Sequence, residues 1–435
     1  MAKYTPHTSA DKAEMLKVIG VNTVEDLFPV PKGYEASLNL DEGKSELEVE
    51  RYLTALSNKN TIFNKIFLGA GAYNHYIPSV VSHLASREEF VTAYTPYQAE
   101  MSQGILQSIF EYQTMISNLT GMDVSNASHY DGSTATADGI LMCLGNKKKA
   151  LVSACLQPDT ITVIRTYCEP YGIEIELIPE CDGKTDVEAL GKLIDESVGA
   201  VCVQQPNFLG QLEDMDSISA VTKKSGIKLV VKCYPISLGI LKTPSEYGAE
   251  VASGDGQPLG MPLAFGGPYL GFLTCKESMM RKLTGRVVGQ TVDHEGRAAY
   301  VLTLQAREQH IRREKASSSI CSNQALCALT ASIYMSALGK EGLKDVALQC
   351  LSKAHYMANK ISTIKGFSLK YKGEFFNEFV VTSQVSTAKI TDALKKLGIL
   401  SGLALNDHDM LWCATEMNTL SDIDLVVKTL EGVAK

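Results

Sequence analysis

The chain has 435 residues, of which 45% are hydrophobic and 21% charged, a composition typical of a folded globular protein with room for two or three domains. The formal net charge is −8, and no basic stripe carries interleaved aromatic residues, so the sequence argues against a nucleic-acid-binding protein. No apolar run approaches the roughly 18 residues that a bilayer-spanning helix needs, so we expect no membrane association.

The eleven cysteines are scattered, with no Cys-x-x-Cys pair and no metal-type Cys/His pairing, so the sequence predicts no metal site. The odd count and the apolar neighbours of Cys143, Cys202 and Cys327 indicate reduced thiols in a hydrophobic core. The first twelve residues contain no apolar signal core. We therefore expect a cytoplasmic protein.

The sequence of the N-terminal part, residues 1–65, predicts a helical arm. Capping boxes that begin at Thr8 and Thr23 predict two short helices, and the Glu-rich, amphipathic run over residues 38–56 predicts a third. None of these segments carries groups suited to catalysis, so we expect at most an arm that packs on a neighbour.

Two aromatic segments follow. In residues 67–78, Gly69 and Gly71 permit close backbone approach, and the segment contains Asn74 and His75. This segment is either a loop that lines a site or a tight turn with packed aromatic rings.

The second aromatic segment, residues 90–100, places Tyr94 and Tyr97 on either side of Thr95 and Pro96. A proline keeps the residue before it extended, so the two tyrosines are presented on a stiff turn. Tyrosine is enriched in recognition surfaces because its ring is rigid and amphipathic. The pattern favours a recognition surface at this turn.

A Gly-Ser-Thr turn precedes an Ala-rich helix and contains Ser133 and Thr134. Free N–H groups and hydroxyls converge at such a helix start, which suits a phosphate. Serine and threonine are also ordinary N-caps, so a phosphate cradle and a simple cap both remain open.

From residue 150 to residue 233, apolar strands alternate with helices, the pattern of a parallel sheet whose sites form beyond the carboxyl ends of the strands. Residues 251–271 contain six glycines and three prolines, so we expect a shaped loop there without regular helix or strand. This loop has no Lys, His or Cys, and its one carboxylate is Asp255.

A segment rich in arginine, which we call the basic band, follows between residues 286 and 314. Its arginines either bind an anion or form a salt-bridged surface. Residues 307–315 within it predict a helix, and two further helices are predicted up to residue 338 and over residues 341–362. Beyond residue 340 the pattern is that of a smaller α+β domain, so we expect a large α/β domain over residues 66–320 and a C-terminal α+β domain over residues 321–435. The band contains Arg286, Arg297, Arg307, Arg312 and Arg313, with Glu308, Glu314, His294 and His310.

This organisation suggests the fold of pyridoxal-phosphate (PLP) enzymes of the aspartate aminotransferase type, fold type I, with a large parallel-sheet domain and a small C-terminal domain. The motifs of residues 93–104, 130–135, 235–239 and 254–271 closely resemble those of the glycine decarboxylase P-protein family. The resemblance covers nearly the whole chain, and in particular the chain is similar to subunit 1 (alpha) of the split, two-subunit form.

The resemblance implies a function. That family decarboxylates glycine on PLP and passes the aminomethyl group to a lipoyl arm carried by the H-protein. In the split form, alpha and beta chains pair and associate into an α2β2 assembly. The cofactor lysine is expected on the beta subunit.

The residues agree with that expectation. PLP chemistry needs a lysine for the aldimine and a carboxylate on the pyridinium nitrogen. In this fold the carboxylate belongs at the end of the strand over residues 229–233, which reads Lys232-Cys-Tyr-Pro, and no lysine lies within residues 256–258. We therefore expect this chain to hold no PLP and no catalytic residue, with Ser133 and Thr134 as a degenerate phosphate turn.

Two lysines lie nearest to the expected position, Lys232 and Lys242. Lys232 alternates out of step with the apolar residues Val231 and Cys233, so we expect it to face solvent or to end the strand. An autonomous PLP enzyme that uses one of these lysines would still lack the carboxylate.

The chain is instead expected to form one wall of the partner's site. Tyr94, Thr95, Pro96 and Tyr97 are the first candidates for this wall, and Asn74 and His75 the second. A purely structural scaffold for the beta subunit, with no contribution to the site, is the alternative function.

Overall fold

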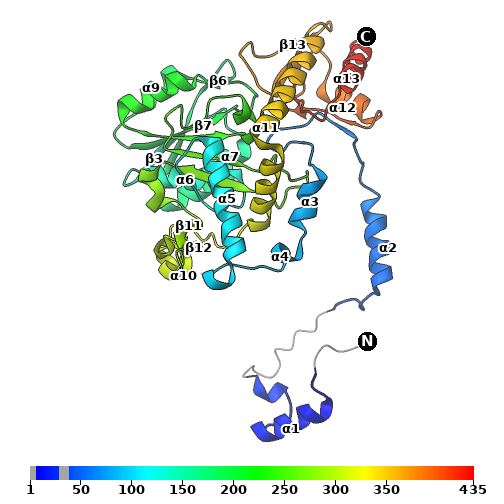
Figure 1. The fold of residues 1–435 in the computed structure, drawn as a ribbon. Helices are drawn as coiled ribbons and strands as arrows, with labels where there is room; N and C mark the ends of the chain where they lie inside the picture. Colours follow the sequence, from blue (N-terminus) through cyan, green and yellow to red (C-terminus); the bar gives the residue numbers. More distant parts are fainter. Residues whose placement is uncertain (1–5, 29–38) are drawn as a thin grey trace. The chain divides into compact units, whose positions relative to one another are not determined.

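The computed structural model describes residues 6–28 and 39–435, which divide into two compact units, Met1–Ile62 and Phe63–Lys435 (Figure 1). In the first unit, Thr8 and Ser45 form capping boxes at the starts of α1 (Ser9–Ile19) and α2 (Glu46–Ser57). The helix predicted after Thr23 is a 3-10 turn, η1 (Glu25–Leu27), and residue 38, where the third predicted helix starts, lies outside the described residues.

The second unit is built on a seven-stranded sheet with the order β2-β10-β9-β8-β7-β3-β4. The five strands from β9 to β4 are parallel, as the alternating pattern predicts, whereas β10 runs antiparallel to both β9 and β2. The bounds are β2 (Val124–Ser125), β3 (Lys149–Ser153), β4 (Glu174–Ile178), β7 (Val198–Gln205), β8 (Lys228–Cys233), β9 (Val251–Asp255) and β10 (Gly271–Cys275).

Helices cover both faces of this sheet, so alternate side chains of each central strand enter different cores. Val201 and Leu229 pack with residues of α5 and α9, while Cys202 and Val230 pack with residues of α6 and α7. Burial on both faces explains why the parallel strands are almost continuously apolar. The helices are α5 (Gln103–Thr120), α6 (Gly132–Leu144), α7 (Pro158–Cys168), α8 (Val187–Leu193) and α9 (Met215–Ser225).

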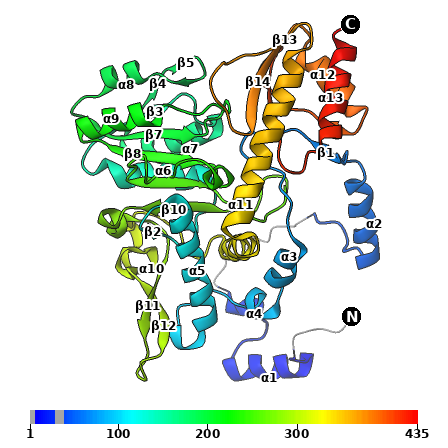
Figure 2. The same ribbon diagram turned by 45° about the horizontal axis from the view of Figure 1, so that its top comes forward.

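Helix α11 (Ala325–Ser362) links the large sheet to the C-terminal sheet, beside which it runs in Figure 2. It joins the two helices predicted up to residue 338 and over residues 341–362, with a kink at Gly339, whose φ of 61° is left-handed. The C-terminal sheet has the order β13-β14-β17-β16 and is covered by α12 and α13. Its elements are β13 (Phe367–Leu369), β14 (Glu378–Ser383), β16 (Leu403–Ala404), β17 (Asp409–Cys413), α12 (Thr387–Lys395) and α13 (Leu420–Val433).

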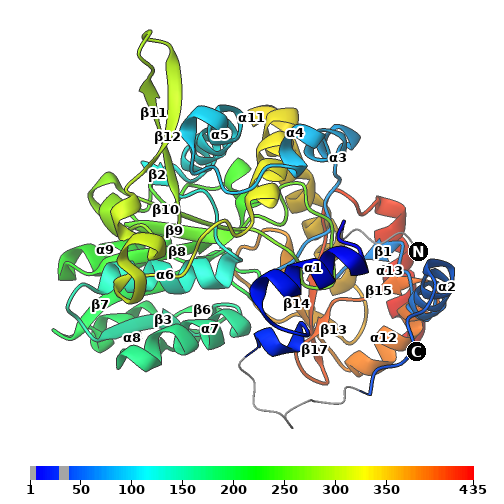
Figure 3. The same cartoon turned by 90° about the horizontal axis from the view of Figure 1, so that it is seen from below.

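A β-hairpin of β11 (Val287–Val292) and β12 (Ala298–Thr303), not predicted from sequence, extends from the second unit (Figure 3). The helix predicted over residues 307–315 is instead a series of short turns. The remaining elements are β1 (Lys65–Ile66), α3 (Ser79–Ala85), α4 (Glu88–Val91), η2 (Ala99–Met101), η3 (Glu169–Tyr171), β5 (Glu180–Cys181), β6 (Lys184–Thr185), η4 (Pro235–Gly239), η5 (Glu277–Lys282), η6 (Gln305–Arg307), α10 (Gln309–Arg312), η7 (Arg313–Lys315) and β15 (Ile399–Leu400).

The prediction that residues 251–271 contain no regular strand is wrong for the first five of them, which form β9. Hydrogen bonds from β8 on one side and β10 on the other hold this segment extended despite Gly254. The irregular loop begins at Gly256 and ends before β10. Pairing on both sides therefore overrides the weak strand preference of glycine.

The boundary predicted between residues 65 and 66 lies close to the division between the two units. The boundary predicted between residues 320 and 321 falls shortly before α11 and stays a prediction, since both sheets belong to one compact unit. In the part of the chain that is described, no helix is both long and apolar enough to cross a membrane.

Helix α6 begins in contact with the end of β9, and this contact requires glycine. A Cβ atom on Gly132 would lie 2.6 Å from the backbone nitrogen of Asp255 and 2.8 Å from the carbonyl carbon of Gly254. Because backbone atoms cannot rotate away as a side chain can, we expect Gly132→Ala to lower the free energy of unfolding by about 1–3 kcal/mol, measured by urea denaturation.

The matched control is Gly432→Ala in α13, where nothing lies within 4 Å of the added methyl group. Alanine favours a helix over glycine by up to about 1 kcal/mol, so this variant should be as stable as the parent or slightly more stable. Equal unfolding midpoints for Gly132→Ala and the parent chain would contradict the tight contact.

Candidate functional site

The carboxyl ends of β8 and β9 and the start of α6 converge at one edge of the large sheet. Lys232 is the fifth residue of β8, Asp255 is the last residue of β9, and Gly132 is the first residue of α6. This edge is where sites form in open α/β sheets.

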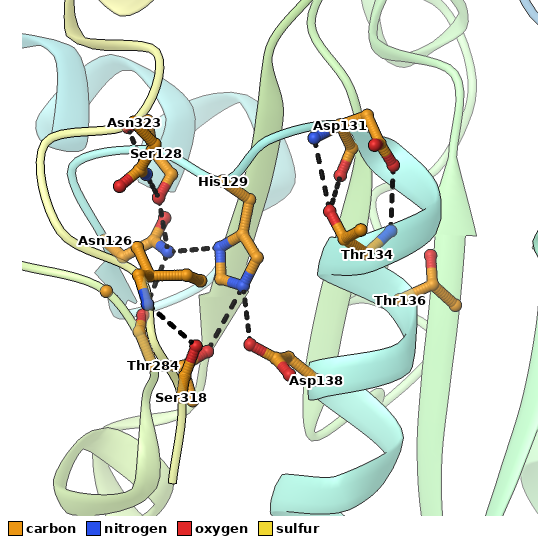
Figure 4. A network of polar contacts seen from close by, with 12 residues as sticks. Asn126, Ser128, His129, Asp131, Thr134, Thr136, Asp138, Thr284, Ser318 and Asn323 are labelled. Atoms are coloured by element: carbon orange, nitrogen blue, oxygen red, sulfur yellow. Dashed lines mark hydrogen bonds and ion pairs between the residues drawn. The ribbon is translucent and has the colours of Figure 1, made fainter. Parts of the chain in front are cut away.

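The N-terminus of α6 is closed by carboxylates of the chain itself. Asp131 Oδ1 accepts hydrogen bonds from the backbone N–H groups of Ser133 (2.8 Å) and Thr134 (2.9 Å), and Figure 4 shows the bond to Thr134. Asp255 Oδ2 accepts from the backbone N–H of Gly132 at 3.1 Å. The first three N–H groups of the helix, which would face a phosphate, are therefore already bound to negatively charged side chains. Of the two interpretations of the Gly-Ser-Thr turn, the capped helix is the one observed.

Lys232 is buried, with 7% of its surface exposed, and its Nζ donates to Gln157 Oε1 at 2.8 Å and to Thr160 Oγ1 at 2.7 Å. The Thr160 hydroxyl also contacts Ser133 Oγ at 2.8 Å. The prediction of a solvent-facing Lys232 is wrong, because β8 is a central strand of a sheet that helices cover on both faces. The alternative prediction, a lysine near the strand end, agrees with the structure, since Lys232 is the fifth of the six residues of β8.

Burial shifts two pKa values in this region toward neutrality. It lowers the pKa of Lys232 to about 8, against the opposing influence of the Asp255 carboxylate. Burial also raises the pKa of Asp255 to about 6, against its hydrogen bonds from Gln257 and Gly132. Lys242, the other lysine considered from sequence, is exposed and pairs with Asp216 at 3.2 Å on the surface.

The cavity between these groups is small, about 30 Å³, with Gly71, Tyr73 and Tyr234 among its lining residues. That volume holds one or two water molecules. With the N–H groups of α6 already bonded, the residues at this edge do not fit PLP, which needs space for its ring and free donors for its phosphate.

A second candidate region is the tyrosine turn, residues 94–97, between α4 and η2. Tyr94 is 88% exposed and Tyr97 is 49% exposed, while Pro96 between them is buried. The Thr95 hydroxyl is hydrogen-bonded to the Ser322 hydroxyl. The turn is therefore anchored at its centre and exposes both rings, in accordance with the stiffness expected from Pro96.

Arg286 holds Tyr97 in place. Its guanidinium lies 4.9 Å from the centre of the Tyr97 ring, and Nη2 donates to the tyrosine hydroxyl at 2.9 Å. Arg286 is itself buried and pairs with Glu308 at 3.6 Å. A cation held over a ring face and hydrogen-bonded to the same residue restricts the ring's rotation.

The tyrosine turn borders a cavity of about 170 Å³, which we call the tyrosine cavity. Phe90, Ile105 and Leu326 supply apolar walls, and Arg286 and Cys321 supply polar groups. Burial raises the pKa of the Cys321 thiol, but hydrogen bonds with Tyr97 and Arg286 outweigh burial and bring this pKa below its usual value. The role of Cys321 was not foreseen because residue 321 lies far from residue 97 in sequence.

The other aromatic segment, residues 67–78, shows features of both interpretations: its rings are packed, and its Gly71 and Tyr73 line the small cavity at the sheet edge. His75 is buried, its Nδ1 lies 2.7 Å from Glu416 Oε2, and its Nε2 is hydrogen-bonded to the Tyr234 hydroxyl. The carbonyl of Asn74 accepts from Thr415 Oγ1 at 2.7 Å. Neither Asn74 nor His75 lines the tyrosine cavity, so both stay second candidates for a wall.

A buried network joins the middle of α6 and the segment before this helix to the loop before β11 (Figure 4). His129 Nε2 lies 3.0 Å from Asp138 Oδ2 and 3.2 Å from the Thr284 hydroxyl, and His129 Nδ1 lies 2.6 Å from Asn126 Nδ2. Sequence reasoning missed this network because its members are separated by up to 158 residues.

The described sheet and its flanking helices define the class of protein: the fold is that of PLP-dependent enzymes of fold type I. The chain is structurally similar to a sphingosine-1-phosphate lyase from Burkholderia pseudomallei, with a TM-score of 0.67, 14% identity and 94% of each chain covered. A glutamate decarboxylase from Lactobacillus brevis gives a TM-score of 0.68 at 13% identity, over 95% of this chain and 98% of that one. At these identities the similarity shows the fold alone.

Closer relatives define the family. The family model described as glycine cleavage system P-protein matches residues 2–430. A glycine decarboxylase (P-protein) of the glycine cleavage system, solved in an inhibitor-bound form, gives a TM-score of 0.92 at 42% identity, over 99% of this chain and all of that one. The chain therefore belongs to the glycine cleavage system P-protein family, an enzyme component of glycine cleavage.

Within the family, the chain is similar to proteins named probable glycine dehydrogenase (decarboxylating) subunit 1. It is 48% identical to the one from Moorella thermoacetica, over 99% of both chains. It is also 48% identical to the one from Desulfitobacterium hafniense, over 98% of both chains. The resemblance read from the sequence motifs is confirmed, and the name of these relatives implies a second subunit.

Asp255 gives the site a testable pH dependence. Its pKa rises from 3.8 to about 6 in the folded chain, so between these values the folded state keeps a proton that the unfolded state has released. Stability contributed by Asp255 therefore falls as pH rises through this window. We expect Asp255→Asn to gain stability relative to the parent chain from pH 4 to pH 6.5, by up to roughly 3 kcal/mol, in urea unfolding.

The control is Asp216→Asn on the exposed face of α9, whose difference from the parent chain should change little over the same range. A constant difference between Asp255→Asn and the parent chain at every pH would show that Asp255 titrates as an ordinary aspartate.

Proposed function

We propose that this chain is the non-catalytic half of a two-subunit glycine decarboxylase, in which the partner subunit holds PLP. The observation that carries this proposal is that the N–H groups at the start of α6 are already hydrogen-bonded to side chains of this chain. Asp131 and Asp255 occupy the N–H groups of α6, and Lys232 is hydrogen-bonded inside a cavity of about 30 Å³. A chain whose cofactor pocket is filled by its own side chains depends on a companion for chemistry.

The remaining steps follow from the family. In the proposed enzyme the partner decarboxylates glycine and the aminomethyl group passes to the lipoyl arm of the H-protein, within an α2β2 assembly. The eleven cysteines are all unpaired, which supports a reducing compartment such as the cytoplasm.

The contribution of this chain to the shared site is the tyrosine turn. Tyr94 presents nearly its full surface, and Arg286 fixes Tyr97 beside a partly apolar cavity. Rigid exposed tyrosines are suited to contact with a partner or substrate, because little conformational entropy is lost when they bind. We place residues 94–97 on the wall of the partner's site, and keep Asn74 and His75 as the second candidates for this wall.

A purely structural scaffold is the alternative, and one variant separates the two functions. In the complex reconstituted with subunit 2, we expect Tyr97→Ala to lower the rate of glycine decarboxylation about tenfold or more. Loss of a wall residue would let the substrate shift from its reactive position, and small displacements of reacting groups lower the rate strongly. The mass of the complex, measured by light scattering, should be unchanged.

Tyr171→Ala is the matched control, since Tyr171 is 65% exposed and lies in η3, outside the tyrosine cavity. The rate of glycine decarboxylation and the mass of the complex should both stay at the parent values in this control. Unchanged turnover in Tyr97→Ala refutes the wall, and loss of assembly with loss of turnover supports the scaffold.

An autonomous enzyme that uses Lys232 is addressed by spectroscopy. A lysine with a pKa near 8 is a competent nucleophile, yet Lys232 is enclosed by Gln157 and Thr160. We expect the purified chain mixed with PLP to show no aldimine absorption band. A band that borohydride fixes to Lys232 would overturn the assignment of PLP to the partner.

A further inference from the structure

A third cavity, of about 440 Å³, lies at the other end of α6 from the closed helix start, and we call it the cationic cavity. It is bounded by Leu141 and Met142 near the C-terminus of α6 and by Ser317. Helix α6 is 13 residues long, so its two ends are about 20 Å apart. Four cationic side chains line this cavity: Arg281, Lys282, Arg307 and Arg312.

These cations form no close ion pair within the described part of the chain. In residues 6–28 and 39–435, no carboxylate lies within 4.0 Å of any of the four, whereas Arg297 of the same basic band pairs with Asp293 at 2.8 Å. Asp138, which also lines the cavity, is paired with His129: its Oδ2 lies 3.0 Å from His129 Nε2 (Figure 4). The sequence left two interpretations of the basic band open, an anion site and a salt-bridged surface. Arg297 belongs to a salt-bridged surface, whereas the four lining cations form no close ion pair among the described residues.

Arg307 carries the strongest evidence. Its Nη2 donates to the carbonyl of Gly285 at 2.6 Å, but its Nε is buried and has no acceptor among the described residues. Burial lowers the pKa of this arginine, against the influence of the neighbouring Glu308. Glu308 is itself engaged by Arg286 at 3.6 Å and His310 at 3.5 Å. Arg307 is half-buried, and its Nη1 makes no hydrogen bond with any described residue, so this nitrogen is the donor that an oxyanion in the cavity could reach.

Two simpler explanations do not account for the cavity. Cations near a helix C-terminus interact favourably with the helix dipole, but this effect is confined to the last turn and needs no enclosed space. Ordinary solvation explains Arg281 and Arg312 singly, but not the gathering of four cations around one cavity.

We propose that the cationic cavity binds an organic phosphate, at a site separate from the tyrosine turn. Guanidinium groups bind phosphate oxygens through paired N–H donors, and the Ser317 hydroxyl adds a neutral donor. The volume of about 440 Å³ exceeds what a phosphate group fills and lies in the range of small-molecule sites. Leu141 and Met142 provide apolar contact for the organic part.

The test uses the complex of this chain with subunit 2 and isothermal titration calorimetry with three probes: adenosine diphosphate, pyrophosphate and inorganic phosphate. We expect adenosine diphosphate to bind once per copy of this chain, more tightly than inorganic phosphate, with an affinity that falls as salt rises. Arg307→Gln should weaken binding about tenfold or more, since a charged hydrogen bond is lost.

Arg312→Gln serves as the second variant, because Arg312 is exposed and its substitution does not disturb the core if Arg307→Gln fails to fold. Arg297→Gln, on the turn of the β11–β12 hairpin, is the matched control and should bind like the parent complex.

Absence of binding by all three probes overturns the proposal, as does equal affinity in Arg312→Gln and the parent complex. If the substitutions at Arg307 and Arg312 instead release subunit 2 and no probe binds, the cations pair with carboxylates of the partner, and the proposal is wrong.

Discussion

Two carboxylates at the start of α6 determine what the large sheet of this chain can do. Asp131 caps the helix from its own turn, and Asp255 reaches it from the end of β9. The helix start of a fold-type-I enzyme is an anion site because its N–H groups point outward. Here those groups are satisfied from within, so the feature that would attract a phosphate stabilises the chain itself.

The filled pocket also explains the buried lysine. Lys232 lies beneath α7 with two hydrogen-bond acceptors, and the nearby Asp255 supplies negative charge in a region with little water. A buried lysine and a buried aspartate with pKa values shifted toward neutrality reduce the cost of enclosing both. Similar shifts occur at catalytic sites, but the cavity beside these two residues is only about 30 Å³ in volume.

The two regions proposed to be functional lie outside this pocket. On one side, Arg286 stiffens the tyrosine turn beside an accessible cavity. On the other, the far end of α6 borders a cavity lined by cations. Arg286 and Arg307 flank the same glutamate, Glu308, so the short turns after β12 connect the two regions. In this arrangement α6 acts as a rigid spacer between a proposed partner surface and a proposed anion site.

Much of the fold follows from local sequence. Capping residues set the start of α1, and alternating apolar segments give the parallel strands, because these signals depend on neighbours within a few residues. The family also follows from the sequence motifs, and the sequence itself shows that residues 256–258 contain no lysine.

Tertiary structure alone decided the rest. Pairing on both sides made a strand of residues 251–255, and helices on both faces of the sheet buried Lys232. The contact of Asp255 with Gly132 and that of Arg286 with Tyr97 join residues more than one hundred positions apart. Sequence periodicity carries no information on such distances, and burial, which sets the charge and the accessibility of these groups, exists only after the chain has folded.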